Sequence, residues 1–312
     1  MAELDPAMAA ILAEINRQAL PSYDTMPATE ARAEALRRNA FWNEIVVPVP
    51  RVEEVVAPGP RGAIRVRLYA GERAGPSAPC LLYIHGGGWV ICSLDTHDTV
   101  CRRLARDGNF VVASVDYGLA PEHPFPHGLD DCHAALAWLR TQGPRLGIDP
   151  GRIAVGGDSA GANLALALCL KLRDAGEPPP RAGALIYGAY TDDHDSPSHA
   201  AFGGGDFVLS TAMMRWFWDH YVPNPARRRD PLVSPLYADL RGLPPLYVSA
   251  AELDPLRDDS ERLARRLIDA GIDFDYRLWR GVAHACIMMG RLLSRADEFT
   301  ADIARFLDAR LT

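Results

Sequence analysis

The five residues Gly-Asp-Ser-Ala-Gly at positions 157–161 constrain the fold more than any other segment of the chain. They stand between an apolar run at 152–156, typical of a buried strand, and a small-residue run at 160–175, typical of a helix. So short a connection requires a tight turn in which Ser159 is strained and its hydroxyl is raised above the sheet. Gly157 and Gly161 stand where strand and helix nearly touch and a side chain would clash. The segment predicts a strand–turn–helix unit.

Short apolar runs alternate with helical runs along most of the chain, which predicts an α/β fold with a mostly parallel sheet covered on both faces. The expected strands are residues 51–57, 63–70, 80–84, 110–115, 152–156, 183–187, 245–250 and 274–279. The expected helices that follow or separate them are residues 129–142, 160–175, 257–270 and 291–310. Gly176 and Gly271 are expected to end their helices in the left-handed conformation.

Two segments fall outside this alternation. Residues 1–45 predict two helices, and residues 190–243 contain no clear strand but three consecutive glycines and an aromatic helical run at 213–221. Connections of this length in compact domains are usually functional. We therefore expect residues 1–45 and 190–225 to form a helical cap over a core built from residues 46–189 and 226–312. A peripheral packing helix is the alternative for the second segment.

Composition excludes several classes of protein. The net charge of −7 argues against nucleic acid as a partner, because phosphate binding needs a basic surface. The N-terminus lacks the features of a secretory signal, and no apolar run reaches the roughly 18 residues of a membrane span. The six cysteines show no Cys-x-x-Cys spacing, which favours free thiols in the cytoplasm over disulfides or zinc. Neither a metal nor a cofactor is predicted.

A serine hydroxyl becomes a strong nucleophile only beside a base that a carboxylate orients. Asp254 follows an expected strand, at the sheet edge where ligands bind, and His284 follows the last strand. Both come after Ser159 in the order Ser, Asp, His that such sites use on this kind of sheet. Asp258 and Asp259 are weaker candidates, because they fall inside the next helix. The sequence predicts a catalytic triad of Ser159, Asp254 and His284.

A second motif, His-Gly-Gly-Gly-Trp at residues 85–89, directly follows the strand at 80–84. Stabilising the negative charge of an acyl-transfer intermediate requires backbone N–H groups aimed at it, and glycines allow the chain to approach that closely. We expect the N–H groups of Gly87, Gly88 and Ala160 to form this oxyanion hole. The acidic segment 192–195 is interpreted as a solvated loop rather than a metal site.

These motifs resemble those of the bacterial hormone-sensitive-lipase-like esterases (family IV carboxylesterases, Gly-Asp-Ser-Ala-Gly branch) of the α/β-hydrolase superfamily. Residues 116–126, Asp-Tyr-Gly-Leu-Ala-Pro-Glu-His-Pro-Phe-Pro, and residues 254–258, Asp-Pro-Leu-Arg-Asp, also match the family. The resemblance runs over nearly the whole chain. It implies an eight-stranded α/β-hydrolase core under a helical cap, the same triad and oxyanion donors, no cofactor, and hydrolysis of short-chain carboxylic esters. It also implies a homodimer that pairs through the last strand.

The chain departs from the family pattern at four positions: Gly118 for an arginine, Cys92 for a glycine, Gly188 for a proline, and Cys286 for an aromatic residue. We expect Gly118 to remove a salt-bridge partner beneath the site. A thiol at Cys286 is expected to widen the pocket beside the histidine.

We expect Trp89, Tyr190 and Leu256 to form pocket walls, because each adjoins a catalytic loop or strand end. The predicted function is a carboxylesterase that acts on small-molecule esters with short to medium acyl chains. An amidase, such as an arylformamidase, using the same triad is the enzymatic alternative. A non-catalytic small-molecule-binding relative is the other alternative, and His284 argues against it.

Overall fold

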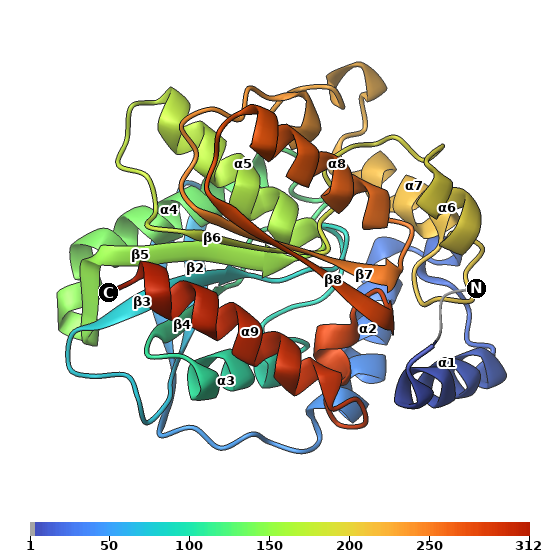
Figure 1. The fold of residues 1–312 in the computed structure, drawn as a ribbon, viewed down its shortest axis with the longest axis horizontal. Coiled ribbons are helices and arrows are strands. Elements are labelled where there is room, and N and C mark those ends of the chain that lie inside the picture. Colours follow the sequence, from blue (N-terminus) through green and yellow to red (C-terminus); the bar gives the residue numbers. More distant parts are fainter. Residues whose placement is uncertain (1–3) are drawn as a thin grey trace.

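The computed structural model describes residues 4–312, and its centre is an eight-stranded sheet (Figure 1). The strand order is β1-β2-β4-β3-β5-β6-β7-β8; β2 is antiparallel to both β1 and β4, and the remaining neighbours are parallel. The strands are β1 (Arg51–Gly59), β2 (Gly62–Ala70), β3 (Ala78–Ile84), β4 (Val111–Val115), β5 (Ile148–Asp158), β6 (Gly183–Ile186), β7 (Leu246–Leu253) and β8 (Phe274–Ala283). The prediction of a mostly parallel α/β sheet is confirmed.

Helices cover both faces of this sheet, with α3 and α9 on one face and α4, α5 and α8 on the other (Figure 1). The helices are α1 (Pro6–Gln18), α2 (Ala28–Asn43), α3 (Asp98–Asp107), α4 (His127–Gln142), α5 (Ala160–Asp174), α6 (Pro197–Phe202), α7 (Thr211–Tyr221), α8 (Arg257–Asp269) and α9 (Arg295–Arg310). No helix within residues 4–312 is long and apolar enough to cross a membrane.

The side chains of β3 show why the sheet is buried on both faces. Cys80, Leu82 and Ile84 belong to the apolar core under α4, α5 and α8, whereas Leu81 and Tyr83 belong to the core under α3 and α9. Successive side chains of a strand point to opposite faces, so an unbroken apolar run supplies both cores at once.

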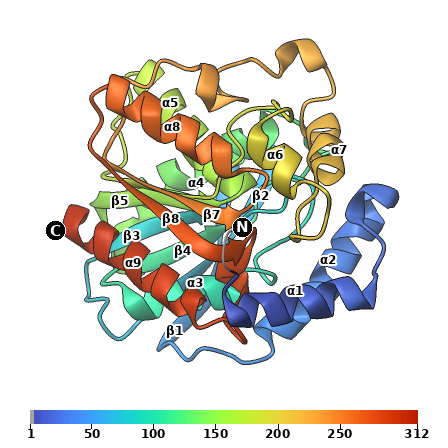
Figure 2. The ribbon, with the colours of Figure 1, turned by 45° about the vertical axis from the view of Figure 1, so that its right-hand side comes forward.

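The helices α1, α2, α6 and α7 lie together beyond the carboxyl ends of the parallel strands (Figures 1 and 2). The first two come from the N-terminal segment and the other two from the long connection between β6 and β7. The short 3₁₀ turn η1 (Tyr23–Thr25) packs on α7, and Asn16 Nδ2 donates to the carbonyl oxygen of Asp206 at 3.2 Å. Two segments far apart in sequence thus meet over one edge of the sheet.

The observed elements differ from the expected ones mainly at their ends. The last helix starts at Arg295 rather than at residue 291, and β5 and β8 extend beyond the apolar runs that predicted them. Helices α3 and α6 were not anticipated. Gly176 (φ 67°) and Gly271 (φ 68°) adopt the left-handed conformation expected after α5 and α8.

Candidate active site

Ser159 lies in the turn between β5 and α5, with φ 55° and ψ −120°. This conformation is strained for a residue with a side chain, and the N–H of Ser159 is tied to the carbonyl oxygen of Ile186 at 2.8 Å. A Cβ atom on Gly157 would lie 2.1 Å from the carbonyl oxygen of Ile84, and one on Gly161 would lie 1.9 Å from it. Both positions therefore require glycine, and the turn holds the serine hydroxyl at the carboxyl edge of the sheet.

The structure brings Ser159, His284 and Asp254 together from the ends of β5, β8 and β7. His284 Nε2 lies 3.0 Å from Ser159 Oγ, and His284 Nδ1 lies 2.7 Å from Asp254 Oδ2. Asp254 is fully buried, and its other oxygen accepts the N–H of Leu256 at 2.8 Å. Because a carboxylate accepts hydrogen bonds, Nδ1 carries a proton and Nε2 is free to accept one from the serine.

Tyr187, at the end of β6, supports the imidazole from the side. Its ring centroid lies 4.8 Å from that of His284 and 6.1 Å from that of Phe299. The residue is fully buried and has φ 35°, another strained conformation beside the site. The sequence placed Tyr187 only at a strand end, and its contact with the histidine needs the three-dimensional fold to be seen.

The glycine-rich turn after β3 lies beside Ser159. Gly87 (φ 109°) and Gly88 (φ 58°) have conformations that other residues rarely adopt, and a Cβ atom on Gly88 would lie 2.1 Å from the ring of Phe217. None of the hydrogen bonds between described residues uses the N–H of Gly87, Gly88 or Ala160. These three donors are available to a negative charge that develops on a bound substrate.

A buried polar cluster lies beneath this turn and was not anticipated from the sequence. Asp158, next to the serine, accepts hydrogen bonds from the Tyr83 hydroxyl (2.7 Å) and the N–H of Gly86 (3.0 Å), and it faces His97 Nε2 at 3.3 Å. Burial alone would raise the pKa of Asp158, but His97 and the other donors hold that pKa below its usual value. Burial, and to a smaller extent the nearby His97, lowers the pKa of His85 to about 4.

Asp259, on α8, is a second buried carboxyl group near the site. It accepts the N–H groups of Tyr190 (2.7 Å) and Thr191 (3.2 Å), where the chain leaves β6 for the long connection. Burial raises the pKa of Asp259 to about 8, although the two N–H groups oppose the shift. Asp259 thus bonds to the backbone of this connection. The carboxylate that bonds to His284 is that of Asp254.

A cavity of about 1110 Å³ opens over Ser159 and His284. Apolar side chains from α1, α2 and α7 form much of its wall, together with two methionines of the 3₁₀ turn η5 (Cys286–Met289) that follows the histidine. They include Ile11, Ile15, Trp42, Met213, Phe217, Met288 and Met289. This volume slightly exceeds the range of about 300–1,000 Å³ that is typical of small-molecule sites.

Most charged side chains around this cavity are paired within the protein, whereas Asp24 is bonded only to the Ser22 hydroxyl among the described residues. Glu14 bonds to Arg17 at 2.8 Å, and Arg37 and Arg38 both bond to Glu34. Arg17, through its hydrogen bonds, lowers the pKa of Glu14 to about 2. The cavity therefore presents apolar surface and compensated charge to a ligand.

Three residues expected in the pocket walls lie elsewhere. Trp89 is buried with its ring stacked on Tyr221 at 4.2 Å, Tyr190 is fully buried beside α8, and Leu256 is buried in the core. None of them is among the residues that line the cavity. Their prediction as walls is wrong, because adjoining a catalytic loop does not determine which way a side chain points. Cys286 is likewise buried outside the lining, so it does not widen the cavity as expected.

Two departures from the family pattern have local consequences. Cys92 adopts φ 72°, so the thiol residue is strained at a position where glycine would not be. Gly118 donates its N–H to Asp131 at 2.9 Å, and Arg61, from the turn between β1 and β2, bonds to the same carboxylate at 2.6 Å. The carboxylate that bonds to Gly118 is thus paired with a cation from another part of the chain.

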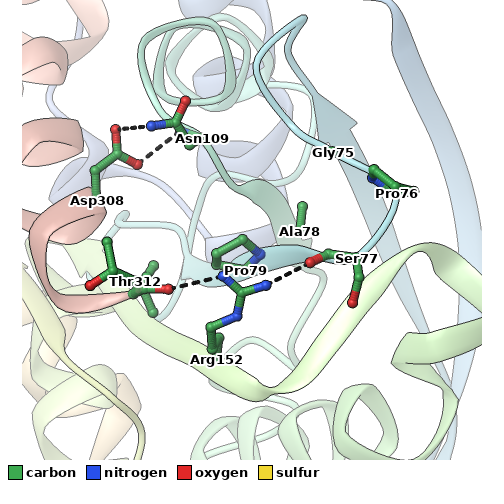
Figure 3. A pocket seen from close by; sticks show the side chains of 10 residues that line it. Gly75, Pro76, Ser77, Ala78, Pro79, Asn109, Arg152, Asp308 and Thr312 are labelled. Atoms are coloured by element: carbon green, nitrogen blue, oxygen red, sulfur yellow. Dashed lines mark hydrogen bonds between the residues drawn. The ribbon is translucent and has the colours of Figure 1, made fainter.

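A second, smaller cavity of about 390 Å³ lies where β3 begins, at the opposite end of the strand from the glycine turn (Figure 3). Its polar groups bond to one another: Arg152 donates to the carbonyl oxygens of Ser77 and Leu311, and Asp308 binds Asn109. These contacts hold the C-terminal end of the chain against the sheet.

Comparison with known proteins identifies relatives over most of the chain. Residues 81–288 match a family described as alpha/beta hydrolase fold. The carboxylic ester hydrolase LipN of Mycobacterium tuberculosis is 37% identical over 268 residues, which cover 84% of this chain and 71% of that protein. The ethyl acetate hydrolase of Pseudomonas putida is 38% identical over 250 residues, which cover 79% of this chain and 78% of that protein.

Solved structures agree with these relatives. The hyperthermophilic esterase from Pyrobaculum calidifontis superposes with a TM-score of 0.94 at 37% identity, over 98% of both chains. The ester hydrolase EH1AB1 from the Lake Arreo metagenome, complexed with a bipyridine phosphonate derivative, superposes with a TM-score of 0.93 at 39% identity, over 98% of both chains. The names of these four relatives give no support to the amidase or to the non-catalytic small-molecule-binding alternative.

Proposed function

The chain belongs to the α/β-hydrolase fold family, in its hormone-sensitive-lipase-like branch of carboxylic ester hydrolases, and from this premise we propose that Ser159, His284 and Asp254 hydrolyse carboxylic esters through an acyl-enzyme. One observation carries the assignment. The serine hydroxyl, the imidazole and the carboxylate are joined by contacts of 3.0 Å and 2.7 Å. Three N–H groups that no hydrogen bond between described residues uses adjoin the serine, and the reacting groups open into an apolar cavity.

In the acylation step, His284 Nε2 takes the proton of Ser159 while the serine oxygen attacks the ester carbonyl. The carbonyl oxygen becomes negatively charged and accepts hydrogen bonds from the N–H groups of Gly87, Gly88 and Ala160. Collapse of this tetrahedral intermediate breaks the bond to the alcohol. The alcohol leaves with the proton that His284 returns to it, and the acyl group stays on the serine.

In the deacylation step, water takes the place of the alcohol. His284 removes a proton from the water, which attacks the acyl carbonyl, and the same N–H groups bind the second oxyanion. The carboxylic acid leaves as Ser159 regains its proton. Asp254 keeps the proton on Nδ1 and stabilises the imidazolium that forms in each half-reaction.

We propose uncharged esters with short to medium acyl chains as the substrates. The apolar cavity and its internally paired charges support an uncharged substrate, and the name of the Pseudomonas putida relative supports a short one. Residues 1–45 and 190–225 act as the cap, since their helices supply most of the apolar wall.

A chain-length series of p-nitrophenyl esters tests this function. We expect kcat/KM to be highest at roughly four to six acyl carbons, as the proposal of short to medium acyl chains requires. A maximum beyond about ten carbons would contradict the short-chain proposal, and absence of hydrolysis across the series would contradict the esterase mechanism.

We also propose a cytoplasmic location and a homodimer. All six cysteines, each within the described residues, are free thiols, as expected in a reducing compartment. Strand β8 is the edge of the sheet and offers unpaired backbone groups to a second copy. Sedimentation should give twice the 34.1 kDa mass of one chain, and fractionation should recover the activity with cytoplasmic markers. A 34.1 kDa species alone would exclude the dimer.

A further inference from the structure

The first glycine of the glycine-rich turn differs from the two that follow it, because both its N–H and its carbonyl oxygen are bonded to side chains. The N–H of Gly86 donates to Asp158 Oδ1 at 3.0 Å, and its carbonyl oxygen lies 2.8 Å from His85 Nδ1. A carbonyl oxygen only accepts, so His85 is the donor in that contact. A Cβ atom on Gly86 would lie 2.5 Å from Asp158 Oδ2. The position of Gly86 therefore follows the position of the Asp158 carboxylate.

His97 faces both oxygens of that carboxylate, with Nε2 only 3.2 Å from Oδ1. Its Nε2 lies 3.3 Å from Asp158 Oδ2, and its Nδ1 lies 2.9 Å from Thr96 Oγ1. The Thr96 hydroxyl is itself fixed by the N–H and the carbonyl oxygen of Ser93, both at 2.9 Å. His97 is 1% exposed, and because a carboxylate oxygen accepts, Nε2 is the donor in this contact.

The two oxygens of Asp158 have different sets of donors. Oδ1 accepts from the Tyr83 hydroxyl and the N–H of Gly86 and also lies 3.2 Å from His97 Nε2, whereas His97 is the one donor that Oδ2 has among the described residues. A buried carboxylate oxygen without a donor is unfavourable. Removal of His97 would therefore favour rotation of the carboxylate toward other donors, and this rotation would displace Gly86.

We propose that His97 is a positioning residue for the ester hydrolysis proposed above, on which this inference rests. His97 fixes Asp158, Asp158 fixes Gly86, and Gly86 sets where the N–H groups of Gly87 and Gly88 point. His97 thus acts on the oxyanion hole through two intermediate residues. It does so from a position 61 residues before Asp158 in the chain.

A direct contact with substrate is the competing role, because His97 and Asp158 both border the cavity. The two roles differ in kinetics. Displaced oxyanion donors weaken binding of the transition state and lower kcat, whereas a lost contact with bound ester raises KM with kcat unchanged.

The test compares His97→Asn with His97→Gln. The glutamine amide nitrogen reaches the place of Nε2 and restores the donor to Asp158, whereas the asparagine amide is too short to do so. We expect His97→Asn to lower kcat on p-nitrophenyl butyrate by roughly 10- to 100-fold, less than the roughly 10²–10³ lost with an entire oxyanion donor. KM should stay within about twofold, and His97→Gln should retain kcat within about threefold of the wild type.

Binding of an alkyl boronic acid, which adds to the serine and places a charged oxygen in the hole, gives a second readout. Its Kd should weaken in His97→Asn by the same factor as kcat/KM. His133→Asn is the matched control, because His133 also pairs with a carboxylate, that of Glu177, on the distant helix α4. It should leave both quantities unchanged.

Equal losses in His97→Asn and His97→Gln, or a raised KM with unchanged kcat, would overturn the inference. An unchanged kcat in a folded His97→Asn protein would also overturn the inference. The proposed function would still hold in that case, because it is tested by ester hydrolysis in the wild type. Should His97→Asn not fold, Thr96→Val removes the hydroxyl that orients Nδ1 and should lower kcat at constant KM. An unchanged kcat in folded Thr96→Val would then contradict the inference.

Discussion

Backbone strain is concentrated around the cavity at the level of single residues. Seven residues other than glycine have positive φ within residues 4–312, and each lines the cavity or adjoins a residue that does. They are Ala19, Trp89, Cys92, Ser159, Tyr187, Val208 and Ala285. Each such conformation costs on the order of 1–2 kcal/mol, and the surrounding packing must offset it. The Ser159 turn is the example that the sequence itself predicted, from the glycines on either side.

The buried Asp259 predicts a dependence of stability on pH. With a native pKa of about 8 and an unfolded pKa of about 4, the native state binds one more proton than the unfolded chain between these values. The free energy of unfolding therefore falls as pH rises across this interval, by up to about 1.4 kcal/mol per pH unit. Asp259→Asn keeps an acceptor for the Tyr190 N–H but has no proton to lose.

Thermal unfolding of wild type and Asp259→Asn at several pH values measures this effect. The variant should lose less stability than the wild type between about pH 5 and about pH 8. Asp269→Asn, an exposed change near the end of the same helix, should follow the wild type. Parallel curves for wild type and Asp259→Asn would show that Asp259 does not take up a proton on folding in this range.

Among the elements, α7 connects the helices over the cavity to the glycine turn. The ring of Phe217 fills the space that a side chain on Gly88 would need, and it also lines the cavity. Ser210 caps the N-terminus of the same helix, since its hydroxyl accepts the N–H of Met213 at 3.0 Å. A shift of α7 would therefore change the cavity wall and the support of the oxyanion donors together.

Replacing Phe217 with alanine tests this connection. The lost ring should enlarge the cavity and move the optimum of the p-nitrophenyl ester series toward longer acyl chains. It should also lower stability by about 3–5 kcal/mol, the usual cost of truncating a buried phenylalanine. Arg215→Ala, on the exposed side of the same helix, should leave profile and stability near those of the wild type. An unshifted optimum in a folded Phe217→Ala protein would contradict this role.

The sequence predicted elements well where a single local cause decides them. Buried parallel strands require continuous apolar runs, and glycine ends α5 and α8 because the backbone there has positive φ. The sequence did not predict helix α3, because charged residues interrupt its apolar positions. These charged residues are Asp98, Arg102, Arg103 and Asp107, and the apolar Leu104 between them is buried. Arg103 is itself 4% exposed, which its charge gave no reason to expect.

At the scale of the whole molecule, the sequence predicted which residues form the catalytic site but not which side chains surround them. The triad and the glycine turn were predictable because strand ends in a parallel sheet meet at one edge. The walls of the cavity were not predictable, because they depend on how α1, α2 and α7 pack over that edge. For the same reason Trp89 and Tyr190 were wrongly expected in the wall, while the contact of His97 with Asp158 went unnoticed.

Covalent labelling at Ser159 tests the central claim most directly. Incubation with a p-nitrophenyl alkyl phosphonate, followed by intact-mass and peptide mass spectrometry, should find one label per chain on Ser159. Ser159→Ala should fold with an unchanged melting temperature, take up no label, and lose at least about 10⁴-fold in ester hydrolysis. A label on another residue, or a Ser159→Ala protein that still hydrolyses esters at the wild-type rate, would contradict the proposed mechanism.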